Sequence, residues 1–147
     1  MLDTLPKYAD IVIGGFPCQD ISVNGKMLGI NGKRSSLYTA IIDTVRLIQP
    51  LIFVAENVGG LLMKKNETSF KKIMSDFNEL GYKVNYKRYC ASAYGVPQTR
   101  ERVFIVGTRN DIPSFTPPEP LQSRPITAKE AIGGGHKPPF MTDIEGK

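Results

Sequence analysis

The sequence predicts an α/β fold in which a parallel β-α-β unit is followed by an antiparallel pair of strands. Residues 11–13 and 51–55 are continuous apolar runs, typical of strands that are buried on both faces of a parallel sheet. Between these runs, four apolar residues recur at helical spacing: Leu37, Ile41, Val45 and Ile48. A strand, a helix and a strand in this order suggest a right-handed crossover in a parallel sheet.

The first half of the chain also shows where these elements begin and end. The strand at 11–13 is followed by Gly14 and Gly15, which favour a turn. Residues 16–34 carry glycines but little periodicity, so we expect a long loop of the kind that is often functional. Ser35 or Ser36 can cap the helix, and Pro50 ends it, because the residue before a proline disfavours helix.

The second half adds a helix and two strands. A helix is predicted over residues 69–80, where apolar side chains form a stripe and Gly81 is a natural C-terminal stop. Residues 84–90 alternate as in a strand near a sheet edge, and residues 103–106 form another apolar strand. We pair these two strands as antiparallel neighbours.

The composition changes after Arg109. Prolines recur between residues 113 and 125, which indicates a stiff linker. Residues 127–130 read Thr-Ala-Lys-Glu, a capping box for a short helix that the glycines at 133–135 would end. We therefore divide the chain into residues 1–109, which hold the sheet, and residues 110–147, a Pro/Gly-rich linker and tail.

The overall composition favours some classes of protein over others. The 147 residues are 41% hydrophobic and carry a net charge of +5, which suits a packed core and a polyanionic partner. Cys18 and Cys90 form neither a CxxC motif nor a disulfide framework, so we expect a reducing cytoplasm. No run approaches the roughly 20 apolar residues of a membrane helix, and no signal peptide is visible. His136 is the only histidine, so we expect no metal site.

Cys18 follows the first predicted strand within Gly14-Gly15-Phe16-Pro17-Cys18-Gln19. Ligands bind at the carboxyl ends of the strands in open α/β sheets, so a cysteine in this place can be exposed and act as a nucleophile. The residue type alone also permits a small buried hydrophobic side chain.

Charged residues border two other predicted strands. Glu56 ends the second strand, on the same rim as Cys18, where it could transfer a proton or bind a ligand, or could be a solvated strand end. Alternation puts Arg100 and Arg102 on one side of the last strand. Two guanidiniums can hold a phosphate or a base carbonyl, although a surface ion-pair ladder with Glu101 explains them too.

Taken together, these segments resemble the DNA cytosine-5 methyltransferase family. Residues 15–19, Gly-Phe-Pro-Cys-Gln, are similar to the family's nucleophile motif. Residues 53–58 match its Glu-Asn-Val motif, residues 98–102 its Gln-x-Arg-x-Arg motif, and residues 34–37 fit the segment between the first two. The motifs occur in the family's order and cover roughly residues 10–107. The resemblance implies a partial Rossmann-like sheet of the class I S-adenosylmethionine-dependent methyltransferases.

The resemblance also implies a mechanism. A cytosine is flipped out of the DNA duplex, and the Cys18 thiolate adds to C6 of its ring. Glu56 would hold or protonate N3 and contact the exocyclic amine, Arg102 would hold O2, and Arg100 would support the site. C5 then takes a methyl group from S-adenosylmethionine. The loop at residues 20–32 corresponds to the family's mobile loop, which closes over the base.

The implied site has three parts. The catalytic residues are Cys18, Glu56, Arg100 and Arg102. The residues expected to bind the substrate are Phe16, Pro17, Gln19, Ser22, Asn57, Val58 and Gln98. The candidates for contact with the cofactor, S-adenosylmethionine, are Phe16 and Pro17. Double-stranded DNA is the expected partner.

The printed sequence also departs from the family. It contains no Phe-x-Gly-x-Gly turn for the cofactor, no target-recognition region and no closing motifs, and the linker after Arg109 is about where recognition would begin. We therefore expect a fragment, a relict or one subunit of a split enzyme, inactive alone, with a possible second chain supplying the missing segments.

Three alternatives remain open from the sequence. The chain could be a catalytically inactive interaction module that keeps the methyltransferase fold, although such a module would be expected to lose Cys18 or Glu56. It could be an RNA-modifying relative of the family. A Cys-His hydrolase is a third reading, which would need His136, in the tail, as its base.

Overall fold

The computed structural model describes residues 5–17, 36–121 and 125–133. It divides into two compact units: residues 1–88 with 102–116, and residues 89–101 with 117–147. The strands β3 (Tyr82–Cys90) and β4 (Glu101–Arg109) each begin in one unit and end in the other.

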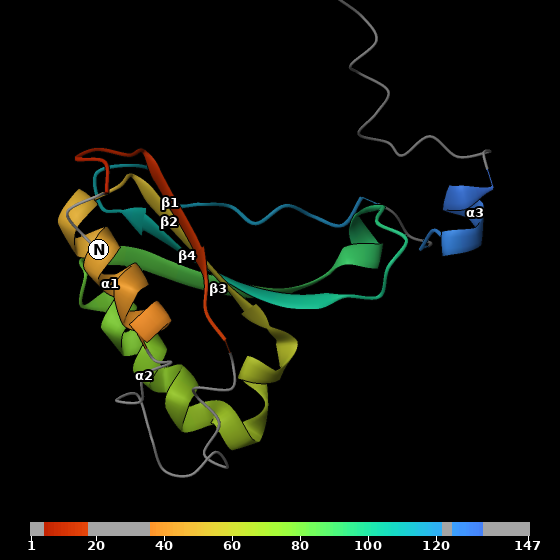
Figure 1. Ribbon diagram of the computed structural model, residues 1–147, viewed down its shortest axis with the longest axis horizontal. Helices are drawn as coiled ribbons and strands as arrows, with labels where there is room; N and C mark the ends of the chain where they lie inside the picture. Colours follow the sequence, from red (N-terminus) through yellow and green to blue (C-terminus); the bar gives the residue numbers. More distant parts are fainter. Residues whose placement is uncertain (1–4, 18–35, 122–124, 134–147) are drawn as a thin grey trace, which may run out of the picture. The chain divides into compact units, whose positions relative to one another are not determined.

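The first unit is built on a four-stranded sheet in the order β1-β2-β4-β3 (Figure 1). Strand β1 (Ile11–Gly15) pairs in parallel with β2 (Ile52–Val58), and β2 pairs in antiparallel with β4. The helix α1 (Ser36–Ile48) connects β1 to β2, and α2 (Glu67–Asn78) precedes β3. The predicted α/β class, with its parallel unit followed by antiparallel strands, is confirmed.

The predicted boundaries are close to those of the structure. The β2 strand runs on to Val58 and so includes the whole of the second motif. Strand β3 is an edge strand next to β4, as expected. The capping box of α3 (Ala128–Ile132) is present: Thr127 Oγ1 accepts from the backbone N–H of Glu130, whose carboxylate accepts from that of Thr127. The two expected caps of α1, Ser35 and the side chain of Ser36, lie outside the described residues.

Both helices pack on one face of the sheet (Figure 1). A Cβ placed on Gly14 would lie 3.0 Å from the side chain of Ile41, so α1 covers the face to which residue 14 belongs. Phe53 and Phe77 stack with their centroids 4.8 Å apart between the sheet and α2. The buried cluster on this face joins the two helices to β2 and β4: Tyr38, Ile41, Ile42, Val45, Phe53, Ala55, Ile73, Phe77, Val103 and Ile105.

Gly107 allows Phe53 to lie flat on the sheet. The two residues are partners in the β2–β4 register, and Phe53 is fully buried. A Cβ on residue 107 would lie 1.9 Å from Cε1 of the Phe53 ring, which no side chain can tolerate without rearrangement. The ring therefore occupies the space that a side chain at residue 107 would need.

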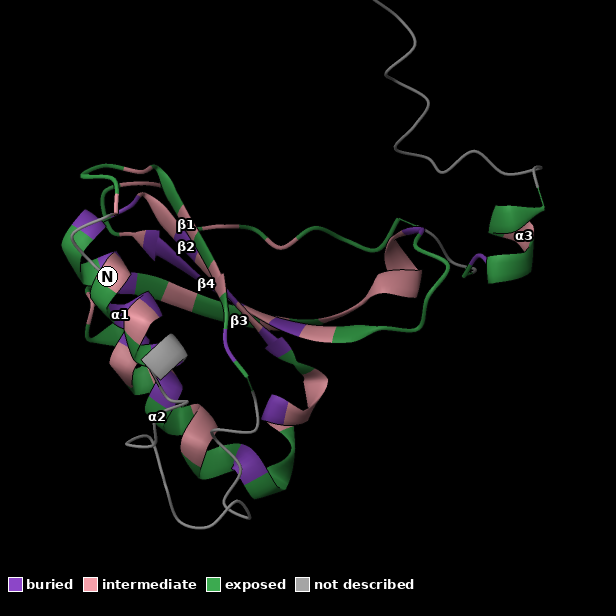
Figure 2. Cartoon of the chain, in the orientation of Figure 1, coloured by how far each residue is buried: buried purple, intermediate pink, exposed green. Residues whose placement is uncertain are grey.

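The other face of β1 is apolar and exposed. Side chains alternate along a strand, so Ile11 and Ile13 point away from the face that α1 covers. They are 53% and 75% exposed, and Figure 2 shows β1 in the colours of exposed and intermediate residues. Since β1 is also an edge strand, both its outer edge and one of its faces are open within the described part of the chain.

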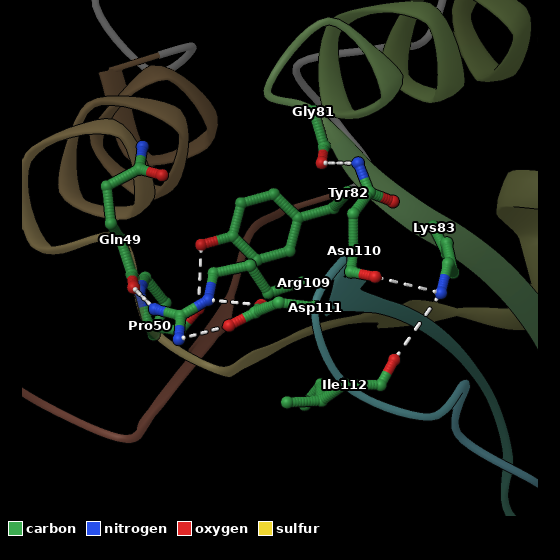
Figure 3. A network of polar contacts seen from close by, with 9 residues as sticks. All are labelled: Gln49, Pro50, Gly81, Tyr82, Lys83, Arg109, Asn110, Asp111 and Ile112. Atoms are coloured by element: carbon green, nitrogen blue, oxygen red, sulfur yellow. Dashed lines mark hydrogen bonds and ion pairs between the residues drawn. The ribbon is translucent and has the colours of Figure 1, made fainter.

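A polar network ties the sheet together at the end where β2 begins and β4 finishes (Figure 3). Arg109 forms a two-point pair with Asp111, with Nε–Oδ1 2.7 Å and Nη2–Oδ2 2.9 Å, and donates from Nη1 to the carbonyl of Gln49. Tyr82 donates its hydroxyl to the carbonyl of Pro50 at 2.7 Å. These contacts join the segment after α1 to β3 and β4. They lie at one end of β2 and β4, and the opposite ends of these two strands carry the candidate site.

The second unit contains the short helix η5 (Ala91–Tyr94) and the segment after residue 117. Tyr94 donates to the carbonyl of Pro118 at 3.1 Å, and the backbone N–H of Leu121 donates to the carbonyl of Ala93 at 3.1 Å. The Pro-rich segment is thus attached to η5 rather than only extended.

Candidate active site

Glu56 and Arg102 form the centre of the candidate site. Glu56 is the fifth residue of β2, and Arg102 is the second residue of β4, so both come from the ends of neighbouring strands. Nε of Arg102 lies 2.6 Å from Oε1 of Glu56, and their side chains are 22% and 34% exposed. A carboxylate and a guanidinium are therefore preassembled, with part of each accessible to a ligand.

This ion pair lies on the face of the sheet opposite the two helices. A Cβ on Gly15 would lie 3.3 Å from Oε2 of Glu56, and Gly15 is one residue away from Gly14, which faces α1. The small size of Gly15 leaves the carboxylate of Glu56 uncovered at the end of β1. The site thus opens where the chain leaves β1 toward Cys18.

Asn57 points to the other face. Its side chain is 1% exposed, donates from Nδ2 to the carbonyl of Phe16 at 3.0 Å and accepts at Oδ1 from the backbone N–H of Val58 at 2.8 Å. In a strand, consecutive side chains lie on opposite faces, so Glu56 and Asn57 cannot both face one ligand. Both polar atoms of Asn57 are occupied within the chain.

Phe16 is part of the core. It is 5% exposed, and its ring lies 5.5 Å from that of Tyr38, centroid to centroid. Tyr38 in turn donates its hydroxyl to Oδ2 of Asp76 at 2.7 Å. Burial, together with this hydrogen bond and the nearby charge of Asp76, raises the pKa of Tyr38 above its ordinary value. The sequence did not predict that Tyr38 and Asp76 support Phe16. The signal that could have indicated Tyr38 is an aromatic residue in the first turn of a helix that follows a glycine-bearing loop.

The remaining predicted residues are distributed differently. Cys18, Gln19 and Ser22 lie outside the described residues. Pro17 and Val58 are exposed. Arg100 and Gln98 belong to the second unit, where the backbone N–H of Arg100 donates to the carbonyl of Gln98 at 3.0 Å. The structure therefore brings Glu56 and Arg102 together, and the joint placement of Arg100 and Arg102 stays a prediction.

Within residues 5–17, 36–121 and 125–133, no group of three or more His, Cys, Asp or Glu side chains could hold a metal ion. None of the helices in these same ranges combines the length and apolarity needed to cross a membrane.

The two expected contacts of S-adenosylmethionine differ in how far they are exposed. Of the two expected cofactor contacts, Phe16 has its ring buried against Tyr38 and Pro17 is exposed. Gly14 and Gly15 approach Ile41 and Glu56, so the space beside them is used by the chain itself.

The comparisons with known proteins agree on one family. A family model described as C-5 cytosine-specific DNA methylase matches residues 2–142. The Type II methyltransferase M.MthTI of Methanothermobacter thermautotrophicus is 42% identical over 130 residues, which cover 86% of this chain and 39% of the relative. M.NgoFVII of Neisseria gonorrhoeae is 45% identical over 138 residues, covering 88% of this chain and 37% of the relative. The chain thus spans less than two fifths of the length of these relatives.

Solved structures agree on the fold. A crystal structure described as a DNA modification methyltransferase encoded within a prophage (E. coli) is 32% identical, with a TM-score of 0.60 over 84% of this chain and 34% of that one. The S. pombe Dnmt2 methyltransferase is 16% identical, with a TM-score of 0.52 over 73% of this chain and 31% of that one, and shows the fold alone.

Proposed function

Because the chain belongs to the C-5 cytosine-specific DNA methylase family, we propose that it forms the base-handling part of an enzyme that methylates cytosine at C5 in double-stranded DNA. The observation that carries this proposal is the Glu56–Arg102 pair on the open face of the sheet. Glu56 is the register partner of Gly15, the last residue of β1, the strand that leads to Cys18. The methyl donor of this chemistry is S-adenosylmethionine.

The pair suits a cytosine because the base presents complementary groups on one edge. Its O2 is an acceptor for the guanidinium of Arg102, and its amino group is a donor for the carboxylate of Glu56. A flipped base could therefore replace the ion pair by two charge-assisted hydrogen bonds, without leaving either charge unpaired. A protonated Glu56 could also donate to N3, where negative charge develops during attack on the ring.

Cys18 supplies the covalent step in this proposal. Its thiolate adds to C6, the S–C6 bond forms, and the electron pair of the C5–C6 double bond moves into the ring, where Glu56 and Arg102 stabilise it. C5 would then take the methyl group from the sulfonium sulfur of S-adenosylmethionine, which would leave as the neutral thioether S-adenosylhomocysteine. Loss of the C5 proton to a base expels the Cys18 thiolate and restores the double bond.

Further polypeptide is needed to complete the enzyme. The relatives are more than twice as long as the matched segment, and β1 exposes an edge and two isoleucines. A parallel strand is normally covered on both faces, and an open edge invites pairing. We propose that a further segment or a second chain covers Ile11 and Ile13 and carries the cofactor and target-recognition parts. The Type II names of the relatives support a place in a restriction-modification system.

The test compares the chain alone with the chain in a complete context. The 147-residue chain is titrated with S-adenosylmethionine by calorimetry and assayed for tritiated methyl transfer to mixed-sequence DNA. The same chain is then grafted into M.MthTI in place of the matched segment. We expect neither tight binding nor turnover from the chain alone, and methylated cytosine from the graft.

The outcomes separate the alternatives. A folded graft that binds S-adenosylmethionine and DNA but transfers no methyl group would favour the inactive interaction module. A graft that methylates RNA instead of DNA would favour the RNA-modifying alternative. Turnover by the chain alone would show that no further segment is required.

A further inference from the structure

The backbone ladder between β1 and β2 changes at Phe16. Phe16 donates its N–H to the carbonyl of Glu56 at 3.4 Å, as expected for a parallel pair. The next bond of such a ladder would run from the N–H of Val58 to the carbonyl of Phe16. Instead, the side-chain amide of Asn57 takes both positions: its Oδ1 accepts from Val58, and its Nδ2 donates to Phe16.

The change leaves two backbone groups that the ladder no longer pairs with each other, the carbonyl of Phe16 and the N–H of Val58. A buried backbone group without a hydrogen-bond partner is unfavourable. An amide side chain is suited to this gap because it offers a donor and an acceptor at once.

Phe16 is held by its ring as well. The ring packs against Tyr38, near the start of α1, and Tyr38 is in turn bonded to Asp76 of α2. Phe16, the residue before Pro17, is therefore held at its N–H, its carbonyl and its side chain. Each contact comes from the first unit of the chain.

We propose that Asn57 is a positioning residue: by replacing one ladder bond, it fixes the direction in which the backbone leaves β1 toward Cys18. This rests on the proposed role of Cys18 as the nucleophile. It differs from the expected role of Asn57 in binding the substrate, because the side chain is buried and its polar atoms are engaged.

The experiment measures the reactivity of Cys18 in the 147-residue chain. Cys90→Ser leaves Cys18 as the only thiol, and its rate of alkylation by iodoacetamide is followed against pH. Asn57→Ala removes both hydrogen bonds. Asn57→Ser keeps a hydroxyl that can make one of them and serves as the conservative variant.

Asn66 provides a matched control. It is also a buried asparagine of the first unit, 3% exposed, and it donates from Nδ2 to the carbonyl of Gly60 at 2.7 Å. Asn66→Ala therefore removes a partly buried bond at a different place, and Asn66→Ser is its conservative counterpart. Urea unfolding of all four variants shows how far each is destabilised, and rates are compared where the native state is fully populated.

We expect the alkylation rate of Cys18 to change several-fold in Asn57→Ala, with Asn57→Ser in between and both Asn66 variants at the parent rate. Small displacements of a reacting group have large effects on rates, which is why a shift of the backbone should be visible here. Equal rates in the Asn57 and Asn66 variants would overturn the proposal. If Asn57→Ala does not fold, Asn57→Ser decides. The measurement needs no methyl transfer, so it is independent of a failure of the proposed function.

Discussion

Nε of Arg102 lies 2.6 Å from Oε1 of Glu56, between β4 and β2, on the face of the sheet that α1 and α2 leave open. The pair is partly exposed, so its free energy is smaller than that of a fully buried pair. Its value for function is geometric: the two groups are already oriented before a ligand arrives, which lowers the reorganisation needed for catalysis.

Arg102→Lys should reduce the kcat/KM of methyl transfer in the grafted enzyme by about tenfold or more, because lysine keeps the charge but lacks the planar fork. Arg109→Lys is the control, since Arg109 pairs with Asp111 at the far end of the sheet. Steady-state kinetics with DNA as the varied substrate measure both variants. An unchanged kcat/KM for Arg102→Lys would remove Arg102 from the site.

Cys18→Ala should abolish methyl transfer in the graft, by several orders of magnitude, and leave the unfolding free energy close to that of the parent. Cys90→Ala is the matched control, because Cys90 lies at the end of β3, in contact with Ser92, and has no proposed role in the reaction. Tritium incorporation and urea unfolding are measured for both. Near-parental transfer by Cys18→Ala would exclude the covalent mechanism.

Gly107→Ala should destabilise the chain by about 1–3 kcal/mol, because the new Cβ would overlap the Phe53 ring. Phe53→Leu in the same chain should recover part of this loss, since the smaller side chain frees space over residue 107, so the two changes should not be additive. Urea unfolding of both single variants and the double variant measures the coupling. Additive losses would contradict the packing described for these two residues.

The stability of the chain should fall as the pH rises past 10.0, the ordinary pKa of tyrosine. Burial and Asp76 raise the pKa of Tyr38 in the folded state, so the folded state retains a proton that the unfolded chain loses. This contribution is fully present below pH 10.0 and is lost above it. Tyr38→Phe should remove part of the alkaline loss and cost about 1 kcal/mol at neutral pH through the lost hydrogen bond.

Urea unfolding in steps from neutral to alkaline pH tests this expectation. Tyr82, whose pKa burial also raises, contributes to the same alkaline loss and serves for comparison as Tyr82→Phe. Identical pH profiles for the parent and Tyr38→Phe would show that Tyr38 is not responsible.

The sequence predicted the elements well because their causes are local. Apolar runs, helical spacing and the Thr127 capping box each act over a few residues, and the structure confirms them. The Phe53–Gly107 contact joins residues far apart in the chain, so no local pattern could reveal it.

The candidate site was predicted only in part. The motifs identified Glu56 and Arg102, and the structure brings them together. Strand alternation could have shown that Asn57 faces away from Glu56, but motif matching treats neighbouring residues as one unit. The bridge that Asn57 makes depends on the end of a different strand, which sequence spacing does not fix.

The alternation of β2 has a consequence for how this segment tolerates mutation. Phe53, Ala55 and Asn57 are buried on the helix side, whereas Val54, Glu56 and Val58 are not. In a saturation library over residues 52–58, substitutions at the first set should lower the amount of folded protein. Those at Glu56 should leave the amount of folded protein unchanged and remove methyl transfer in the grafted enzyme. Positions at which substitution lowers abundance would then alternate along the segment with positions at which it does not. This period of two residues is that of a strand, and it can be observed without any structure determination.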